Sequence, residues 1–310
     1  MVEFPSACLS NGCIDVQLYL PDSENGFYRG TRFEWSGVIR SLRYRGHECF
    51  GQWKDFHSPQ YHDCITGPAG EFQAEDTPDH DFPRVKEGDL FLRLGVGLLM
   101  KTGGGEFARF STYPIRDASG WTITESPRRL SFQHSGSSST GMSYRFKKVV
   151  SVEESAPRLS LLHRIENTGR IPIVTRHYYH NFLCMDGIPP GPSLELALPV
   201  APIVQPSPQS PLAVSGTTVS LLRRLEANER ILVQLLDTRA TYALEIRQRA
   251  TGFGVSISSD QLSSLLLWVN DRVFCPEPYI DISVNPGEEF TWSVWYDCCE
   301  GTSQGGATAA

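Results

Sequence analysis

TRHYYHNF, residues 175–182, concentrates histidine, tyrosine and asparagine side chains in one short segment. Side chains alternate between the two faces of a β-strand, so His177, Tyr179 and Asn181 share one face. A buried polar side chain needs a hydrogen-bond partner, which makes this face poor material for a core and good material for the floor of a polar pocket. We therefore predict that these three residues face a binding site. His180 points the other way, and we expect it to be a packed, hydrogen-bonded histidine.

A second segment, FCPEPYI at residues 274–280, places Glu277 between two prolines. The proline rings fix the backbone and limit the directions in which the carboxylate can point. Together the two segments offer a histidine and a carboxylate, one able to donate a proton and one able to accept it.

Residues 175–182 resemble the T-N-H-x-Y-F-N-L segment of the galactose mutarotases, the aldose 1-epimerases. CPEPY at 275–279, followed by NPGEEF at 285–290, is similar to the late glutamate and "PGE" turn of that family. The resemblance implies an all-β fold, the galactose mutarotase-like antiparallel β-sandwich or supersandwich, over roughly residues 10–297. It also implies His177 as the general acid on the sugar ring oxygen and Glu277 as the base that removes the anomeric proton. Neither a metal nor an organic cofactor is required by that mechanism.

The sequence departs from the family pattern at several positions. Arg176 replaces the usual asparagine, His180 replaces a phenylalanine, and the His-Gly-Gly segment has only YHDCITGP at 61–68 as a counterpart. The expected activity is therefore an aldose 1-epimerase-like isomerisation, and the sequence does not specify its substrate. One alternative is an acid–base isomerase, lyase or cyclase that acts on a modified sugar or a non-sugar molecule. The other is a carbohydrate-binding module without turnover.

Four further residues are candidates for substrate binding. Arginine forks suit sugar hydroxyls, and Arg29 and Arg32 lie in the aromatic-rich segment FYRGTRFEWSG at 27–37, where a surface Arg–Glu pair is the alternative. His62 is expected in a polar loop over the pocket, with an exposed or core histidine as the alternative. Asp186 follows the histidine strand and either contacts substrate or stabilises a turn.

Composition narrows the class of protein. The formal net charge of −7 disfavours nucleic-acid binding, and no apolar run approaches the roughly 20 residues that span a bilayer. The N-terminal residues show no secretory signal, so we expect a cytoplasmic protein whose partner is a small molecule, a sugar or a sugar-like compound. The eight cysteines include no C-x-x-C pair and are interpreted as reduced, small buried side chains rather than zinc ligands.

Short alternating segments separated by turn residues predict strands through most of the chain. We expect one β-sandwich domain over residues 1–300 and a disordered tail over 301–310. The proline-rich segment 199–211 is predicted to be a surface loop. The expected strands cover residues 13–20, 36–44, 90–100, 121–134, 142–154, 157–168, 194–199, 217–224, 231–236, 242–249, 253–258, 264–269 and 289–297.

Overall fold

The computed structural model describes residues 3–73, 81–118, 120–237 and 241–300. The predicted disordered tail lies outside this part of the chain. The described residues form antiparallel strands with two short 3-10 turns, Phe82–Arg84 and Met185–Gly187, and contain no α-helix. The predicted all-β antiparallel sandwich is therefore confirmed. No helix in the described residues is long and apolar enough to cross a membrane.

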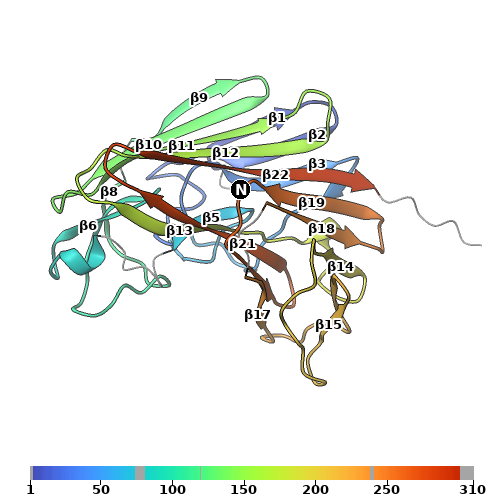
Figure 1. Ribbon diagram of the computed structural model, residues 1–310. Coiled ribbons are helices and arrows are strands. Elements are labelled where there is room, and N and C mark those ends of the chain that lie inside the picture. Colours follow the sequence, from blue (N-terminus) through green and yellow to red (C-terminus); the bar gives the residue numbers. More distant parts are fainter. Residues whose placement is uncertain (1–2, 74–80, 119, 238–240, 301–310) are drawn as a thin grey trace, which may run out of the picture.

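The largest sheet has ten strands; in Figure 1 its part formed by residues 122–167 and 289–300 lies in the upper layer, whereas Leu194–Ala197 and Leu212–Ser215 lie at the lower right. Its centre consists of long strands in which buried and exposed residues alternate, as expected for a sheet with one face on a core. In spatial order its strands are β15 (Leu212–Ser215), β16 (Thr218–Leu221), β14 (Leu194–Ala197), β18 (Tyr242–Gln248), β19 (Phe253–Ser259), β22 (Glu289–Glu300), β12 (Arg158–Asn167), β11 (Ser143–Val152), β10 (Arg129–Ser137) and β9 (Thr122–Ser126).

A five-stranded sheet packs under the large sheet. Its strands are β17 (Ile231–Leu236), β20 (Ser264–Val269), β21 (Phe274–Val284), β13 (Ile173–His180) and β5 (Ala69–Gln73). Rings from the two sheets meet between the layers: Phe72 of β5 contacts Phe146 of β11 and Trp292 of β22 in edge-on pairs. The other face of the five-stranded sheet is therefore the one left for a pocket.

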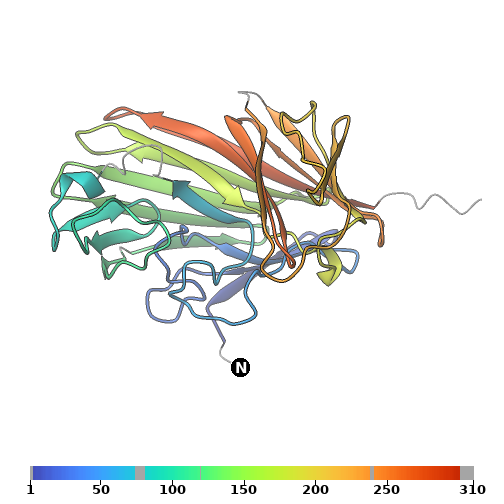
Figure 2. The same ribbon diagram turned by 90° about the horizontal axis from the view of Figure 1, so that it is seen from below.

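Two smaller sheets complete the molecule. One contains β1 (Ser6–Ser10), β2 (Ile14–Tyr19), β3 (Val38–Tyr44) and β4 (His47–Glu48), and the other contains β6 (Leu90–Arg93), β7 (Gly97–Met100) and β8 (Ile115–Asp117). Seen from below, the cyan β6–β8 region lies at the opposite end of the molecule from the orange strands that include β20 (Figure 2).

Most predicted strands are present, and the differences have local causes. The segments expected as single strands over 90–100 and 121–134 are hairpins, β6–β7 and β9–β10. Gly95, with φ of 71°, makes the first turn possible, and Pro127 lies in the second. β5 was missed because all of its residues are buried, so its sequence AGEFQ shows no alternation of polar and apolar residues.

The cysteine prediction is partly confirmed. Cys49, Cys64, Cys275 and Cys298 are buried, whereas the other cysteines are exposed or half-buried, and none of the described cysteines forms a disulfide. The single-domain organisation stays a prediction.

Candidate functional site

A cavity of about 610 Å³ opens on the outer face of the five-stranded sheet. Its sheet residues come from alternate positions of neighbouring strands: Gln73, Arg176, His180, Leu232, Leu266, Trp268, Glu277 and Tyr279. Loops supply the remaining wall: Arg32, Trp53, Lys54, Tyr61, His62, Asp63, Arg109, Phe110 and Arg230. Cavities of this size accommodate small organic ligands, so this is the candidate site.

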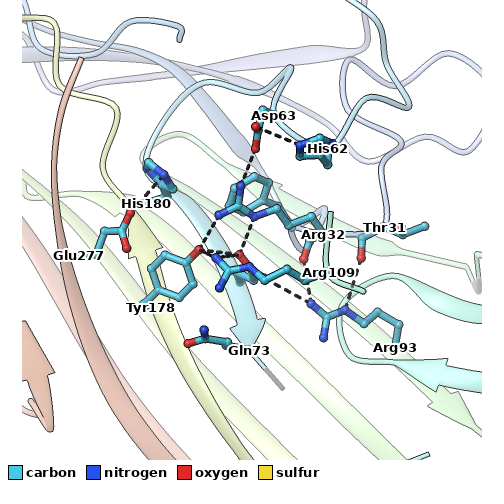
Figure 3. A network of polar contacts seen from close by, with 12 residues as sticks. Thr31, Arg32, His62, Asp63, Gln73, Arg93, Arg109, Tyr178, His180 and Glu277 are labelled. Atoms are coloured by element: carbon cyan, nitrogen blue, oxygen red, sulfur yellow. Dashed lines mark hydrogen bonds and ion pairs between the residues drawn. The ribbon is translucent and has the colours of Figure 1, made fainter. Parts of the chain in front are cut away.

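Glu277 and His180 meet on the wall of the cavity. Nε2 of His180 lies 3.1 Å from Oε1 of Glu277, and both side chains are almost completely buried. The strand register explains the meeting, because Tyr178 of β13 pairs with Tyr279 of β21 and the residues two positions further along are also neighbours on this face. Figure 3 shows the two side chains pointing at one another. The described part of the chain thus contains a histidine–carboxylate pair inside a pocket.

Burial pushes the ionisation of these two groups toward their neutral forms. It raises the pKa of Glu277 to about 7, against the opposing effect of the nearby guanidinium groups of Arg32 and Arg109. Burial also lowers the pKa of His180 well below its usual value, and the same two arginines lower it further. Groups shifted in this way at a cavity wall are candidates for proton transfer near neutral pH.

A buried network of arginines and carboxylates lies beside the pair (Figure 3). Arg32 contacts Oε2 of Glu71 through Nε at 2.8 Å and also bonds Asp63, and all three side chains are buried. Tyr178 donates a hydrogen bond of 2.5 Å to Glu71 and accepts one from Arg109 at 3.0 Å. These contacts fix two guanidinium groups and a phenol next to His180 and Glu277.

Glu71 is the centre of this network. Its carboxylate lies within 4 Å of the guanidinium groups of Arg32, Arg93 and Arg109. Burial alone would raise the pKa of Glu71, but the three cations together hold it below its usual value. Asp63 is a second anchor, and His62, whose Nε2 lies 3.1 Å from Asp63, helps Arg32 to keep the pKa of that carboxyl low against burial.

His177 does not face the cavity, so the prediction that it meets Glu277 was wrong. It lies on the inner face of β13, where its ring is 4.9 Å from that of Phe72 and 5.1 Å from that of Trp292, between centroids. Burial and the charge of Lys148 lower the pKa of His177 to about 3. The expected orientation was inverted: His180, interpreted as a packing residue, takes the place beside Glu277.

Tyr179 and Asn181 also lie away from the cavity. Tyr179 shares the inner face, where its hydroxyl is 2.6 Å from Nε2 of His163. The amide of Asn181 donates to the carbonyl of Pro276 at 2.8 Å, and its oxygen accepts from Tyr296 at 2.7 Å. Asn181 is therefore not placed to contact substrate, but it anchors the backbone immediately before Glu277.

The remaining predicted binding residues divide equally. Arg32 and His62 line the cavity, as expected. Arg29 is not among the lining residues, and its backbone N–H donates to the carbonyl of Pro59. Asp186 lies at a turn, where its carboxylate contacts Nδ1 of His47 at 3.0 Å and accepts from the backbone of Glu48. It stabilises that turn, which was the stated alternative.

Several site residues were missed from the sequence. Glu71 lies on the strand without alternation, and Arg109 lies in the loop between β7 and β8, where no periodic pattern marks it. The sequence did contain a signal for Tyr178 and Tyr279. Tyr178 is adjacent to the candidate His177, and Tyr279 lies two positions after the candidate Glu277 and therefore on the same face of its strand. Their rings stack at 4.4 Å between centroids on the outer face of the sheet.

The fold is the galactose mutarotase-like β-sandwich. Solved structures with this fold include the galactose mutarotase related enzyme from Lactobacillus acidophilus (TM-score 0.55, 12% identity, covering 96% of this chain and 98% of that one). An aldose epimerase homologue from C. elegans superposes with a TM-score of 0.54 at 13% identity, over 97% of this chain and 99% of its own.

The Slr1438 protein from Synechocystis is also similar, with a TM-score of 0.58, 14% identity and 96% of both chains covered. No protein-family model matches the sequence. A search of curated proteins finds no match either. At these identities the likeness shows the fold alone.

Proposed function

We propose that the protein is an aldose 1-epimerase-like isomerase that opens and recloses the hemiacetal ring of a sugar with the His180–Glu277 pair. The observation that carries the proposal is the contact of 3.1 Å between Nε2 of His180 and Oε1 of Glu277 on the cavity wall. Binding alone needs no such pair, whereas ring opening needs a proton donor and a proton acceptor. The likeness to galactose mutarotase-like structures supports the same chemistry.

The reaction transfers two protons and leaves the composition of the sugar unchanged. One member of the pair takes the proton of the anomeric hydroxyl while the other gives a proton to the ring oxygen. The bond between the anomeric carbon and the ring oxygen breaks, and a free aldehyde forms. The aldehyde rotates by half a turn, the hydroxyl attacks its other face, and both protons return.

The distribution of the proton between His180 and Glu277 follows from their environment. Assigning Glu277 as base and His180 as acid requires the ionised pair, whereas burial favours the neutral pair with the proton on Glu277. The two forms carry the same number of protons, and the short contact lets them interconvert. Whichever residue is the acid, the reactive form of the pair is the one in which His180 and Glu277 share a single titratable proton.

The arginine network orients the substrate in this proposal. Arg32 and Arg109 line the cavity and are held by Glu71, which also accepts a hydrogen bond from the buried Tyr178, so the two guanidinium groups are fixed before a sugar enters. Groups fixed in advance lose little freedom on binding and can stabilise charge as it develops on the sugar oxygens.

Polarimetry of freshly dissolved α-D-glucose and α-D-galactose tests the proposal. We expect the protein to accelerate the change in optical rotation above the buffer rate, in proportion to its concentration. Binding of the same sugars without acceleration would identify a carbohydrate-binding module. If the protein neither binds any aldose nor accelerates its mutarotation, the substrate is not a sugar. The pair would then serve an acid–base reaction on another small molecule.

The pH dependence of kcat/KM provides a separate prediction. The pair loses its single proton as pH rises through about 7, the value to which burial raises the pKa of Glu277. Activity should therefore be present below about pH 7 and decline above it, while the acidic limb lies well below the usual histidine value because the pKa of His180 is lowered. The measurement is the buffer-corrected polarimetric rate across this range. An increase in kcat/KM as the pH rises through 7 would contradict the assignment of the singly protonated His180–Glu277 pair as the reactive form.

A further inference from the structure

Two cations lie against one tryptophan, Trp53, on the part of the cavity wall that reaches solvent, where Lys54 is half-buried and Arg230 is exposed; this part is called the mouth of the cavity. Nζ of Lys54 lies 3.7 Å from the centroid of the Trp53 ring, and the guanidinium carbon of Arg230 lies 5.2 Å from it. Lys54 is also 5.5 Å from the ring of Tyr61, another residue of the cavity wall. Contact with an aromatic face holds the stem of each cation in place and leaves its N–H groups able to bind an anion.

An unbroken series of ring contacts connects these cations to the acid–base pair. Trp53 packs edge-on against Trp268 at 4.8 Å between centroids, and Trp268 packs edge-on against His180 at 5.3 Å. The cations therefore lie two indole rings away from the proposed reacting groups, along the wall of the same cavity. A ligand whose ring lies near His180 and Glu277, and which extends along Trp268 and Trp53, would place its far end at Lys54 and Arg230.

These two cations differ from the other basic residues of the cavity. Arg32 and Arg109 are engaged by Glu71, and Nε of Arg176 lies 3.3 Å from Asp281. Among the described residues, no carboxylate forms an ion pair with Lys54 or Arg230. The two cations thus retain charge that an incoming anion can use.

The charge of the cavity is opposite to that of the chain. The described lining residues contain five arginines and lysines against two carboxylates, whereas the whole chain has a formal net charge of −7. Because carboxylates engage Arg32, Arg109 and Arg176, the positive charge that stays uncompensated is that of Lys54 and Arg230. A neutral sugar would gain nothing from it, whereas an anionic ligand would be attracted and oriented.

We infer that the site takes an acidic sugar, whose anionic substituent is bound at the mouth by Lys54 and Arg230 while its ring lies at His180 and Glu277. The substituent is a phosphate ester or a carboxylate, since both offer paired oxygens to an ammonium and a guanidinium. This inference rests on the proposed function in taking a sugar ring as the ligand, and it adds the class of sugar.

Binding measured by calorimetry at low ionic strength tests the inference. The ligands are D-glucose 6-phosphate, D-glucuronate, D-glucose and inorganic phosphate, each titrated into wild type, Lys54→Gln/Arg230→Gln and Lys147→Gln. Lys147 is exposed on β11 and does not line the cavity, so it is the control for loss of one charge. Lys54→Arg keeps the charge at the mouth and should retain binding.

We expect at least one acidic sugar to bind about tenfold or more tightly than D-glucose, and the double variant to lose that advantage. Affinity for D-glucose should stay the same, Lys147→Gln should behave as wild type, and added salt should weaken only the acidic ligand. Whichever acidic sugar meets this pattern identifies the substituent. The salt series on wild type gives the same answer if the double variant folds poorly.

The inference is overturned if neither acidic sugar binds more tightly than D-glucose, or if the advantage survives in the double variant. It is also overturned if inorganic phosphate binds as tightly as D-glucose 6-phosphate, because the sugar ring would then contribute nothing. Polarimetry on the bound sugar is read separately. Charge-dependent binding without mutarotation would sink the proposed isomerase and leave the acidic-sugar site, whereas mutarotation of neutral sugars alone would do the reverse.

Discussion

Glu277→Gln is expected to lower kcat/KM for mutarotation by about 10²- to 10⁴-fold, the usual contribution of a group that transfers a proton. The substitution keeps the shape of the side chain and removes its ability to exchange a proton with His180, which lies 3.1 Å away. Substrate affinity should change little, because the amide can still form hydrogen bonds to the sugar. The measurement is the polarimetric rate together with a binding isotherm for the same sugar.

His180→Gln should cause a loss of the same order, and His177→Gln is its matched control on the same strand. The two histidines point to opposite faces of β13, so only His180 can exchange a proton with a ligand in the cavity. His177→Gln should lower the free energy of unfolding, since it disturbs the packing against Phe72 and Trp292, while the folded fraction keeps a rate near that of wild type.

The pattern of the three variants separates the possible roles. A large loss of rate in His177→Gln with an intact rate in His180→Gln would restore His177 as the acid and contradict the geometry. Equal small losses in all three variants, with binding unchanged, would mean that the protein does not use this pair for proton transfer. The control measurement for each variant is its melting temperature.

Glu71→Gln is expected to lower the free energy of unfolding by about 3–5 kcal/mol, the typical cost of removing one partner from a buried ionic network. The carboxylate is completely buried and lies against Arg32, Arg93 and Arg109, so the amide leaves three guanidinium groups without their shared counter-charge. Urea denaturation at neutral pH measures the change. Activity should fall as well, because Arg32 and Tyr178 lose their fixed positions.

Glu154→Gln is the matched control for this stability prediction. Glu154 forms a pair with Arg128 at 3.1 Å on the surface, where an ion pair contributes at most about 1 kcal/mol. Equal effects of the two substitutions would show that Glu71 is solvated in the folded protein and does not hold the arginines together.

The pH dependence of the Glu71 effect has a definite sign. Because the three arginines hold the pKa of Glu71 below its ordinary value of 4.5, its ionisation stabilises the folded state above that value. The stabilisation is lost as pH falls through the lowered pKa. The difference between wild type and Glu71→Gln should therefore be full at neutral pH and shrink below about pH 4.5.

The sequence alone predicted the fold class and most of the strands. Alternating segments such as those of β2, β11 and β12 have one face on a core, and this pattern is visible without any structure. The hairpins β6–β7 and β9–β10 were each predicted as a single strand, because a turn of two or three residues hardly interrupts the alternation of polar and apolar residues. β5 was missed because burial on both faces removes the periodicity altogether.

The sequence also singled out the two segments that meet at the cavity, and Glu277, Arg32 and His62 line it; their roles stay predictions. The sequence could not determine which face of β13 is exposed to the cavity. Alternation places His177 and His180 on opposite faces of the strand, but it does not indicate which of the two faces another sheet covers. The tertiary structure decides this: the large sheet packs on the side of His177, and Trp292 and His163 bury that polar face. It also brings Arg109 to the cavity wall, and Glu71 to the buried network that holds Arg32 and Arg109, from segments without any pattern of their own, since contacts between distant segments are set by the packing of the sheets.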